Sequence, residues 1–361
     1  MKKDRILKIL VSVIILFFLA VVLFLKFDTA DAALFTDNYL RPLLGNTFVG
    51  FLEKAYFNTT DKIQQITYRG IGVPPQFLNP GIQSSLAPIP ITTGLPKVAG
   101  EGVWRDRPLK LFPGKEVVAY TFVRPDPARP FAYVTLVTMD MTQMNLAVVA
   151  GTKEPGGKLG NFGPGIIPPD VVHSGNLVAA FDGGFQYRDG MYGMMVGGKT
   201  YVPLENNVGT LVGYTDGSLK IINYTGQDLG NNVAFIRQNC PILVENGQVF
   251  ALNELNKKLW GRTFNADIYT WRSGIGLTAQ GNLIYAVGNN LSPESLATAL
   301  KMARAVNAIQ LDINPFWVRF NFFEPNGRGG YTTSTLTKDL KDGSKAYLTS
   351  YSKDFFFLYK K

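Results

Sequence analysis

The stretch NAIQLDINPFWVRF, residues 307–320, decides much of what can be inferred about the fold. Ala308, Ile309 and Leu311 predict a buried strand, but Asp312 interrupts the apolar run and Asn314-Pro315 prevent the strand from continuing. A carboxylate at the end of a buried strand costs free energy unless it is paired or hydrogen-bonded. The stretch therefore predicts either a local turn or a functional group held at a strand end.

A helix is predicted immediately before this strand. Ser292 is a suitable N-cap and Pro293 suits the first helical position. This helix would bury one apolar stripe and lead the chain into the strand that carries Asp312. The residues that recur at helical spacing are Leu296, Leu300, Ala303 and Val306.

From Gly102 onward, short apolar segments alternate with turns rich in Gly, Asp and Asn, which is typical of β-strands. The Asp-Gly pair at 216–217 and the Asn-Gly pair at 246–247 favour tight hairpins, because these residues tolerate a positive φ. Residues 101–361 therefore predict one α+β domain of mostly antiparallel, twisted β-sheets with few helices. The aromatic tail at 345–361 is expected to supply closing strands.

The N-terminal part of the sequence predicts a membrane segment. Residues 9–25 contain no charged side chain and are about long enough to cross a hydrocarbon core of ~30 Å. The basic residues within 1–8 favour a cytoplasmic tail, so the segment would be a signal-anchor of a single-pass membrane protein with an extracytoplasmic body. A cleaved signal peptide is the alternative, because TADAA at 29–33 offers small residues near a cut.

Residues 27–100 are interpreted as a stalk followed by a linker. The spacing of apolar residues over 36–67 is compatible with helix, with a break near Pro42 to Gly45. Residues 71–100 are rich in Pro, Gly and Ser, a composition typical of an extended linker.

Composition limits the classes of partner. The formal net charge is +9, but apart from the first residues the basic side chains are scattered, so nucleic acid is not an expected partner. A mild attraction to anionic lipid or to a phosphate-bearing glycan fits this charge better. Cys240 is the single cysteine, which excludes an internal disulfide.

A second strand end resembles the first. LVAAFDGGF, residues 177–185, leads an apolar strand into Asp182, and Gly183 and Gly184 would leave backbone N–H groups open to a ligand. Asp312 and Asn314 would face the same side if their strand continued that far. The structural alternative is a pair of Asx turns, in which each side chain bonds to its own backbone.

A third segment, TWRSGIG at 270–276, adds a basic group. Arg272 could hold a phosphate or carboxylate with two parallel hydrogen bonds, or form a salt bridge to one of the aspartates. Trp271 could stack on a sugar or belong to the core. Other candidates for lining a pocket are Gln186, Arg188 and His173, although a histidine in a surface loop is the simpler interpretation.

Together these segments resemble the phosphodiester glycosidase family. The matching pieces are FDGGF at 181–185, RSGIG at 272–276 followed by QGNLIYAV, and LATALKMARAVNAIQLDIN at 296–314. AGTKEPGG at 150–157 and RQNCPILVENG at 237–247 resemble an exported, membrane-anchored bacterial branch. The resemblance spans about 101–320 and implies a hydrolase.

Two departures from the family pattern bear on substrate and activity. Asp182 stands where the family has asparagine, and Ile313-Asn314 stand where it has two glycines. Pro315 removes one backbone donor from the second loop and stiffens it. The departures imply a different substrate or a loss of activity.

The leading hypothesis is a hydrolase that cleaves a sugar-phosphodiester or related glycosidic bond in an envelope glycan. Asp182 and Asp312 would be the two catalytic carboxylates, Arg272 would hold the phosphate and Asn314 would orient the substrate. No cofactor is required by this hypothesis.

Two alternatives stay open. The first is a non-catalytic module that binds a glycan or phosphate through the same side chains. The second is a Ca²⁺ or Mg²⁺ site formed by Asp182, Asp312 and Asn314. The separation of the two carboxyl groups distinguishes catalysis from binding, because glycosidases keep them within about 10 Å.

Overall fold

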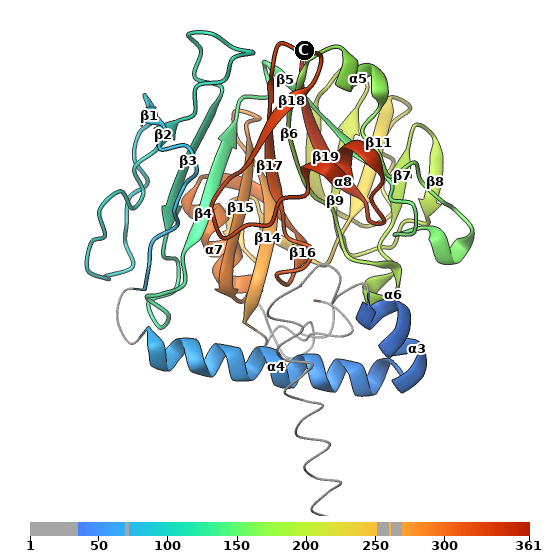
Figure 1. Cartoon of the computed structure of the whole chain (residues 1–361), viewed down its shortest axis with the longest axis horizontal. Coiled ribbons are helices and arrows are strands. Elements are labelled where there is room, and N and C mark those ends of the chain that lie inside the picture. Colours follow the sequence, from blue (N-terminus) through green and yellow to red (C-terminus); the bar gives the residue numbers. More distant parts are fainter. Residues whose placement is uncertain (1–34, 69–71, 251–259, 261–268) are drawn as a thin grey trace, which may run out of the picture. The chain divides into compact units, whose positions relative to one another are not determined.

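The computed structural model of the chain describes residues 35–68, 72–250, 260 and 269–361 (Figure 1). The predicted membrane segment at 9–25 and its cytoplasmic tail lie outside these ranges. Within them, no helix has both the length and the apolar character that a membrane crossing requires. The chain divides into two compact units, Met1–Thr60 and Asp61–Lys361.

The described part of the first unit is helical, as the spacing over 36–67 indicated. It contains η1 (Thr36–Leu40), α3 (Arg41–Leu44) and the greater part of α4 (Asn46–Thr67). The break falls at Gly45, whose φ of 83° ends α3. The Arg41 guanidinium pairs with the Glu53 carboxylate at 2.5 Å, which ties the short helix to the long one.

The second unit is built from three sheets within the described residues, and every pairing of its named strands is antiparallel. The largest sheet has nine strands, in the order β1-β2-β3-β4-β15-β14-β16-β12-β13. These are β1 (Ile82–Gln83), β2 (Arg105–Asp106), β3 (Val118–Val123), β4 (Val134–Met139), β15 (Leu283–Leu291), β14 (Thr270–Thr278), β16 (Ala305–Ile313), β12 (Ile242–Glu245) and β13 (Gln248–Val249).

The other two sheets have five strands each. One has the order β10-β9-β11-β7-β8 and the other β18-β17-β6-β19-β5. Their strands are β5 (Met144–Val149), β6 (Leu177–Asp182), β7 (Met194–Val196), β8 (Lys199–Val202), β9 (Val208–Tyr214), β10 (Leu219–Tyr224), β11 (Val233–Gln238), β17 (Phe320–Pro325), β18 (Tyr331–Thr335) and β19 (Phe355–Lys360).

One apolar core joins the three sheets. Ile275 of β14, Phe181 of β6 and Leu211 of β9 are completely buried members of the same cluster. The remaining helices are short: η2 (Gly157–Leu159), α5 (Pro169–His173), α6 (Tyr187–Gly190), α7 (Pro293–Met302) and α8 (Ser344–Thr349). The predicted α+β class with mostly antiparallel sheets and few helices is confirmed.

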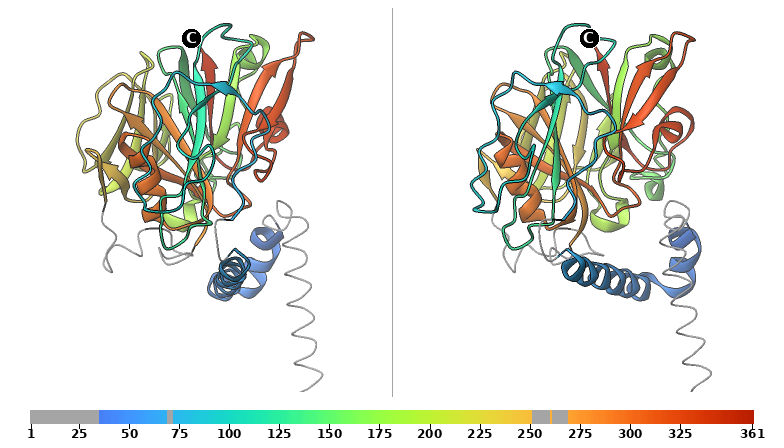
Figure 2. Two further views of the ribbon diagram at one scale, coloured as in Figure 1. Left: turned by 90° about the vertical axis from the view of Figure 1, so that its left-hand side faces the viewer. Right: turned by 60° about the vertical axis from the view of Figure 1, so that its left-hand side comes forward.

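The predicted helix before Asp312 is α7, which lies against β14, β15 and β16 (Figure 2). Ser292 caps it in a capping box with Ser295, and Pro293 is its first residue. Gly274 makes room for this packing, because a Cβ there would contact the side chains of Leu296 and Leu300. The helix ends at Met302, so Val306, which we expected on its apolar stripe, instead belongs to β16.

The segment expected to be a linker belongs to the second unit. β1 pairs with β2 and so adds an edge strand to the nine-stranded sheet. Ile89 is 7% exposed, and the Lys338 N–H donates to the carbonyl of Gln76 at 3.0 Å. These contacts join residues 72–100 to the rest of the second unit, although most of their side chains are exposed or half-buried. Pro and Gly permit this extended course.

An irregularity in β16 sets the direction of its last side chains. Arg272 of β14 is opposite Ile313, but Gly274, two residues later, is opposite Gln310, three residues earlier. The extra residue in β16 is a bulge, and bulges redirect side chains. Asp312 therefore does not follow the simple alternation from Gln310 that an unbroken strand would impose.

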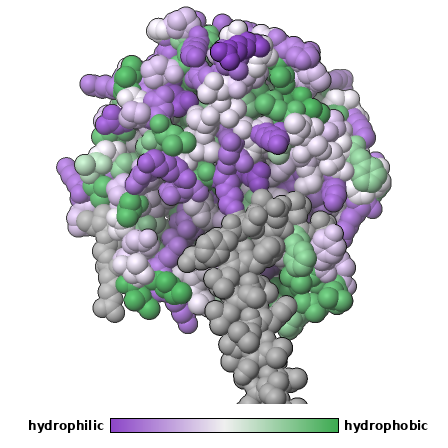
Figure 3. All heavy atoms as spheres, in the orientation of Figure 1, coloured by the Kyte–Doolittle hydropathy of each residue, from purple (hydrophilic) through white to green (hydrophobic). Residues whose placement is uncertain are grey.

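The aromatic tail forms one helix and one strand. Its first part is α8, where we expected a strand, and its last part is β19, as predicted. β19 lies between β5 and β6, so Lys353 and Asp354, which precede it, are carried into the interior. Over the face of the body seen in Figure 3, hydrophilic side chains are interspersed with small apolar groups, which fits the scattered charge in the sequence.

Candidate active site

Asp182 lies at the end of β6 and is 1% exposed. Within the described residues its two carboxylate oxygens accept four hydrogen bonds. The hydroxyl groups of Ser273 and Tyr285 donate two of them, the latter at 2.7 Å. The backbone N–H groups of Asp312 and Arg319 donate the others at 3.2 and 3.1 Å. Because all four partners donate, they favour an ionised carboxylate that fixes several strand ends around it.

Asp312 is 4% exposed and forms an ion pair with Lys353. Its other carboxylate oxygen accepts a hydrogen bond from the Ile313 N–H at 3.1 Å. The Lys353 ammonium also lies 4.7 Å from the centre of the Trp317 ring, which is a favourable position for a cation. Asp312 thus has a cationic partner from a distant part of the chain.

The structure brings the two predicted carboxylates together. The Asp312 amide nitrogen is 3.2 Å from Asp182 Oδ2, so standard bond lengths place the two carboxyl carbons within about 8 Å of each other. This upper bound lies below the limit of about 10 Å for the two carboxyl groups of a glycosidase. By this geometric criterion, a catalytic pair is favoured over two unrelated carboxylates.

Burial makes both carboxyl groups weaker acids. It raises the pKa of Asp182 to about 6, although the hydrogen bonds from Ser273 and Tyr285 act in the opposite direction. It raises the pKa of Asp312 to about 7, because desolvation and the neighbouring charge of Asp182 outweigh the attraction of Lys353. A carboxyl group with a pKa near neutrality is suited to exchanging a proton during a reaction at pH 7.

These raised pKa values predict a dependence of stability on pH. Between pH 3.8, the ordinary pKa of Asp312, and about 7, its raised value, the folded state holds the proton more tightly than the unfolded state. Raising the pH across this window should therefore lower the free energy of unfolding, by about 1.4 kcal/mol per pKa unit.

Urea unfolding at a series of pH values measures this effect, with the double variant Asp312→Asn/Lys353→Met as the comparison. The wild type should lose more stability than this variant between pH 4 and 7. Equal slopes in the two proteins would show that Asp312 has no raised pKa.

The glycine pair after Asp182 accommodates a second ion pair. A Cβ at Gly183 would collide with Asp354, and one at Gly184 would collide with the guanidinium of Arg237. The Gly184 N–H donates to Asp354 Oδ2 at 2.9 Å, and this carboxylate pairs with Arg237 at 2.8 Å. We expected these glycines to admit a ligand, but side chains of the protein fill the space beside both of them.

Arg272 is completely buried on the face of β14 that packs against α7. Its Nε donates to the carbonyl of Leu291 at 2.7 Å and its Nη1 to Gln310 Oε1 at 2.9 Å. Burial lowers its pKa to about 10. Ser273, the next residue, points to the opposite face and bonds Asp182. Strand alternation thus directs Arg272 away from the face on which Ser273 meets the carboxylates.

Asn314 and Trp271 meet through their backbones beside the site. Asn314 follows β16 with a φ of 69°, and its N–H donates to the carbonyl of Trp271 at 2.8 Å. Its side chain accepts a hydrogen bond from the Phe316 N–H at 2.9 Å, which is the Asx turn considered as the alternative. The Trp271 side chain is half-buried and lines a cavity described below.

The other predicted lining residues lie at two different places. His173 ends α5 and precedes β6, whereas Asp182 ends β6, so the strand separates them by roughly 17 Å. His173 is exposed and is not brought to the carboxylates. Gln186 and Arg188 follow the glycine pair, and the neighbouring Tyr187 N–H donates to the Glu154 carboxylate at 2.9 Å.

The side chains do not fit a divalent cation. Asp182 is surrounded by donors, Asp312 is paired with an ammonium group, and the Asn314 oxygen accepts a backbone hydrogen bond. A Ca²⁺ or Mg²⁺ ion needs several free oxygen ligands and is repelled by Lys353. In the described ranges, no group of three or more His, Cys, Asp or Glu side chains could hold a metal ion.

Several residues of the cluster were not found from the sequence. Lys353 and Asp354 lie in the tail, which we interpreted only as strand-forming, and Arg237 lies in a segment that was noted for its resemblance. A local signal existed in SKD at 352–354, where two charged residues stand directly before the aromatic run FFFLY. Ser273 and Tyr285 carried no such signal, because polar residues within apolar strands are common.

A comparison with known protein families indicates which class of protein this segment resembles. Residues 175–312 match the family model described as phosphodiester glycosidase. The match runs from the start of the β6 segment to Asp312 and includes Asp182 and Arg272. The predicted resemblance is confirmed over this segment, and the match supports a hydrolase of the phosphodiester glycosidase type.

Two solved structures are similar to about two thirds or more of the chain. One is the catalytic domain of zebrafish N-acetylglucosamine-1-phosphodiester alpha-N-acetylglucosaminidase, auto-inhibited by its pro-peptide, with 13% identity and a TM-score of 0.43 over 72% of this chain and 88% of that chain. The other is a hypothetical protein from Synechocystis, with 11% identity and a TM-score of 0.36 over 68% of this chain and 63% of that chain. No curated protein sequence matches the chain.

Proposed function

We propose that the protein is an exported, membrane-anchored hydrolase that cleaves a sugar-phosphodiester or related glycosidic bond in an envelope glycan. The family match supports the type of reaction. The observation that carries the proposal is the meeting of Asp182, Asp312 and Lys353 in one buried cluster, with the two carboxyl groups no farther apart than in glycosidases.

The surroundings of the two carboxyl groups indicate different roles. Asp182 is saturated by donors, so it holds the strand ends in place and keeps a negative charge beside Asp312. Asp312 carries the proton transfer, because its pKa of about 7 lets it both give and accept a proton near neutral pH.

Lys353 links the substrate to Asp312. A phosphodiester anion competes with the Asp312 carboxylate for the ammonium group, and its binding frees that carboxyl group to act on the glycosidic oxygen. Lys353 then stabilises negative charge on the departing phosphate. Lys353 is 2% exposed and Arg272 is 0% exposed, so for either side chain the role of holding the phosphate requires a rearrangement that exposes it.

The proposed location rests on the sequence alone. Residues 9–25 would hold the protein in the bilayer, with 1–8 in the cytoplasm and the body outside. Proteolysis of intact cells should then digest the body and spare the N-terminal segment.

We expect the purified full-length chain to release free sugar from a synthetic sugar-1-phosphate methyl diester and from purified envelope glycan. Chromatography of the products, with and without protein, measures the release. Saturable binding of the diester without any release would instead favour the non-catalytic binding module, which the saturation and burial of Asp182 would then explain.

A further inference from the structure

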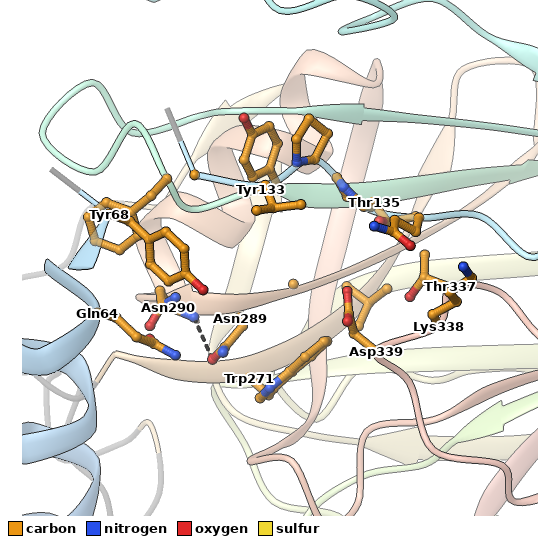
Figure 4. Close-up of a pocket in the computed structure, with 18 residues that line it drawn as sticks. Gln64, Tyr68, Tyr133, Thr135, Trp271, Asn289, Asn290, Thr337, Lys338 and Asp339 are labelled. Carbon is orange, nitrogen blue, oxygen red and sulfur yellow. Dashed lines mark hydrogen bonds between the residues drawn. The ribbon is translucent and has the colours of Figure 1, made fainter. Parts of the chain in front are cut away.

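A cavity separate from the acidic cluster lies beside the ends of β4 and β15 (Figure 4). Its volume is about 420 Å³, which is within the range of pockets that bind small molecules. Its walls come from segments far apart in the chain: the end of α4, residues 72–76, the stretch before β4, the start of β14, the end of β15 and residues 337–339.

Buried polar side chains of this cavity have no hydrogen-bond partner in the described part of the chain. Thr135, Asn290 and Thr337 are 4, 8 and 3% exposed, and no hydrogen bond recorded between described residues reaches their side chains. The Oε1 atom of Gln64, on another wall, is likewise buried without a partner. Buried polar groups without partners cost free energy, so groups of this kind indicate a place for a hydroxylated ligand or for water.

Aromatic side chains stand around the same space. Trp271, Tyr68 and Tyr133 are labelled in Figure 4, and Tyr68 stacks with Phe131 at a ring separation of 6.5 Å. Rings provide broad apolar surfaces, whereas the threonine and amide groups provide short polar contacts. The charged lining residues Lys338 and Asp339 have opposite signs, so the cavity has no strong preference for an ion.

This combination fits a pyranose ring, which has apolar faces and a rim of hydroxyl groups. We propose that the cavity binds a neutral sugar residue of the glycan. The cavity adjoins the site, because the carbonyl of Trp271 accepts a hydrogen bond from Asn314, two residues after Asp312. This inference deepens the proposed function. That the bound sugar belongs to the substrate rests on the proposed function.

The variant Thr135→Val tests the proposal with little risk to the fold. It removes a hydroxyl group that has no recorded protein partner and keeps the shape of the side chain, so the folded protein should be at least as stable. Thr121→Val is a matched control, because Thr121 lies on the neighbouring β3, is 2% exposed, has no hydrogen-bond partner for its hydroxyl group among the described residues, and does not line the cavity.

Saturation-transfer NMR and calorimetry on the full-length chain would use four neutral probes: chitotriose, maltotriose, cellotriose and mannotriose. We expect at least one to bind, with an affinity about three- to tenfold lower in Thr135→Val and unchanged in Thr121→Val. Asn290→Gly provides a second test, because glycine suits the φ of 61° at this position and removes the amide group. This variant should weaken binding as well.

Absence of binding for all four probes, or equal affinity in the wild type, Thr135→Val and Asn290→Gly, would overturn the proposal and leave a cavity filled by water. The probes contain no phosphodiester, so binding is measured apart from hydrolysis. A protein that cleaves the diester but ignores these sugars would retain the proposed function and lose the sugar site. A protein that binds these sugars but does not cleave the diester would retain the sugar site and lose the proposed function.

Discussion

Asp312→Asn is expected to lower the turnover of a sugar-1-phosphate diester by about 10²- to 10⁴-fold, the usual contribution of a general acid or base. The amide keeps the size of the side chain but cannot exchange the proton at neutral pH. Initial rates of sugar release, measured at saturating diester, test the effect. A rate within a factor of about two of the wild type would remove Asp312 from the reaction.

The ion pair with Lys353 requires a second variant. Asn at position 312 leaves the Lys353 ammonium buried without its carboxylate partner, which by itself can destabilise a protein by about 3–5 kcal/mol. Asp312→Asn/Lys353→Met removes both charges, so it should recover much of the stability while remaining inactive. Asp216→Asn, in the exposed turn between β9 and β10, is the control for the chemical change and should retain full activity.

Arg237→Met is expected to give the largest loss of stability, about 3–5 kcal/mol, because it leaves Asp354 as an unpaired buried charge. Both side chains of this pair are 0% exposed. The guanidinium also donates to the carbonyl groups of Phe185 and Gln238 at 2.9 and 2.7 Å, so its removal leaves further acceptors unsatisfied. Urea unfolding of the wild type and the variant measures the difference.

Two further variants isolate the ion pair. Arg328→Met makes the same chemical change at an exposed position and should alter stability by less than about 0.5 kcal/mol. Arg237→Met/Asp354→Leu removes both charges and should be less destabilised than the single variant. If the double variant loses the sum of the two single effects, the two groups act independently and the pair does not hold the glycine loop.

The features that could be predicted from the sequence depend on local interactions. Ser292 and Pro293 identified the start of α7, because capping involves only neighbouring residues. Asn246 and Gly247 both adopt the positive φ that a tight hairpin requires. The two strand ends with aspartate were also visible, because an ionisable residue in a buried run stands out in any sequence.

The features that could not be predicted depend on distant parts of the chain. Lys353 reaches Asp312 because β19 inserts between β5 and β6, two strands that come much earlier in the chain. The bulge in β16 arises from its pairing with β14 and left no trace in the alternation of residues 305–313. Gly183 and Gly184 signalled a close approach correctly, but glycine does not reveal whether a ligand or the protein itself makes that approach.

The position of β19 also affects the order in which the molecule can mature. β5 and β6 do not pair with each other, because β19 lies between them. The Gly184–Asp354 contact joins residues that are 170 positions apart. Pairings of such long range form slowly, so a nascent chain would expose two unfinished edges for some time. Hydrolytic competence would then be the last property that the polypeptide acquires.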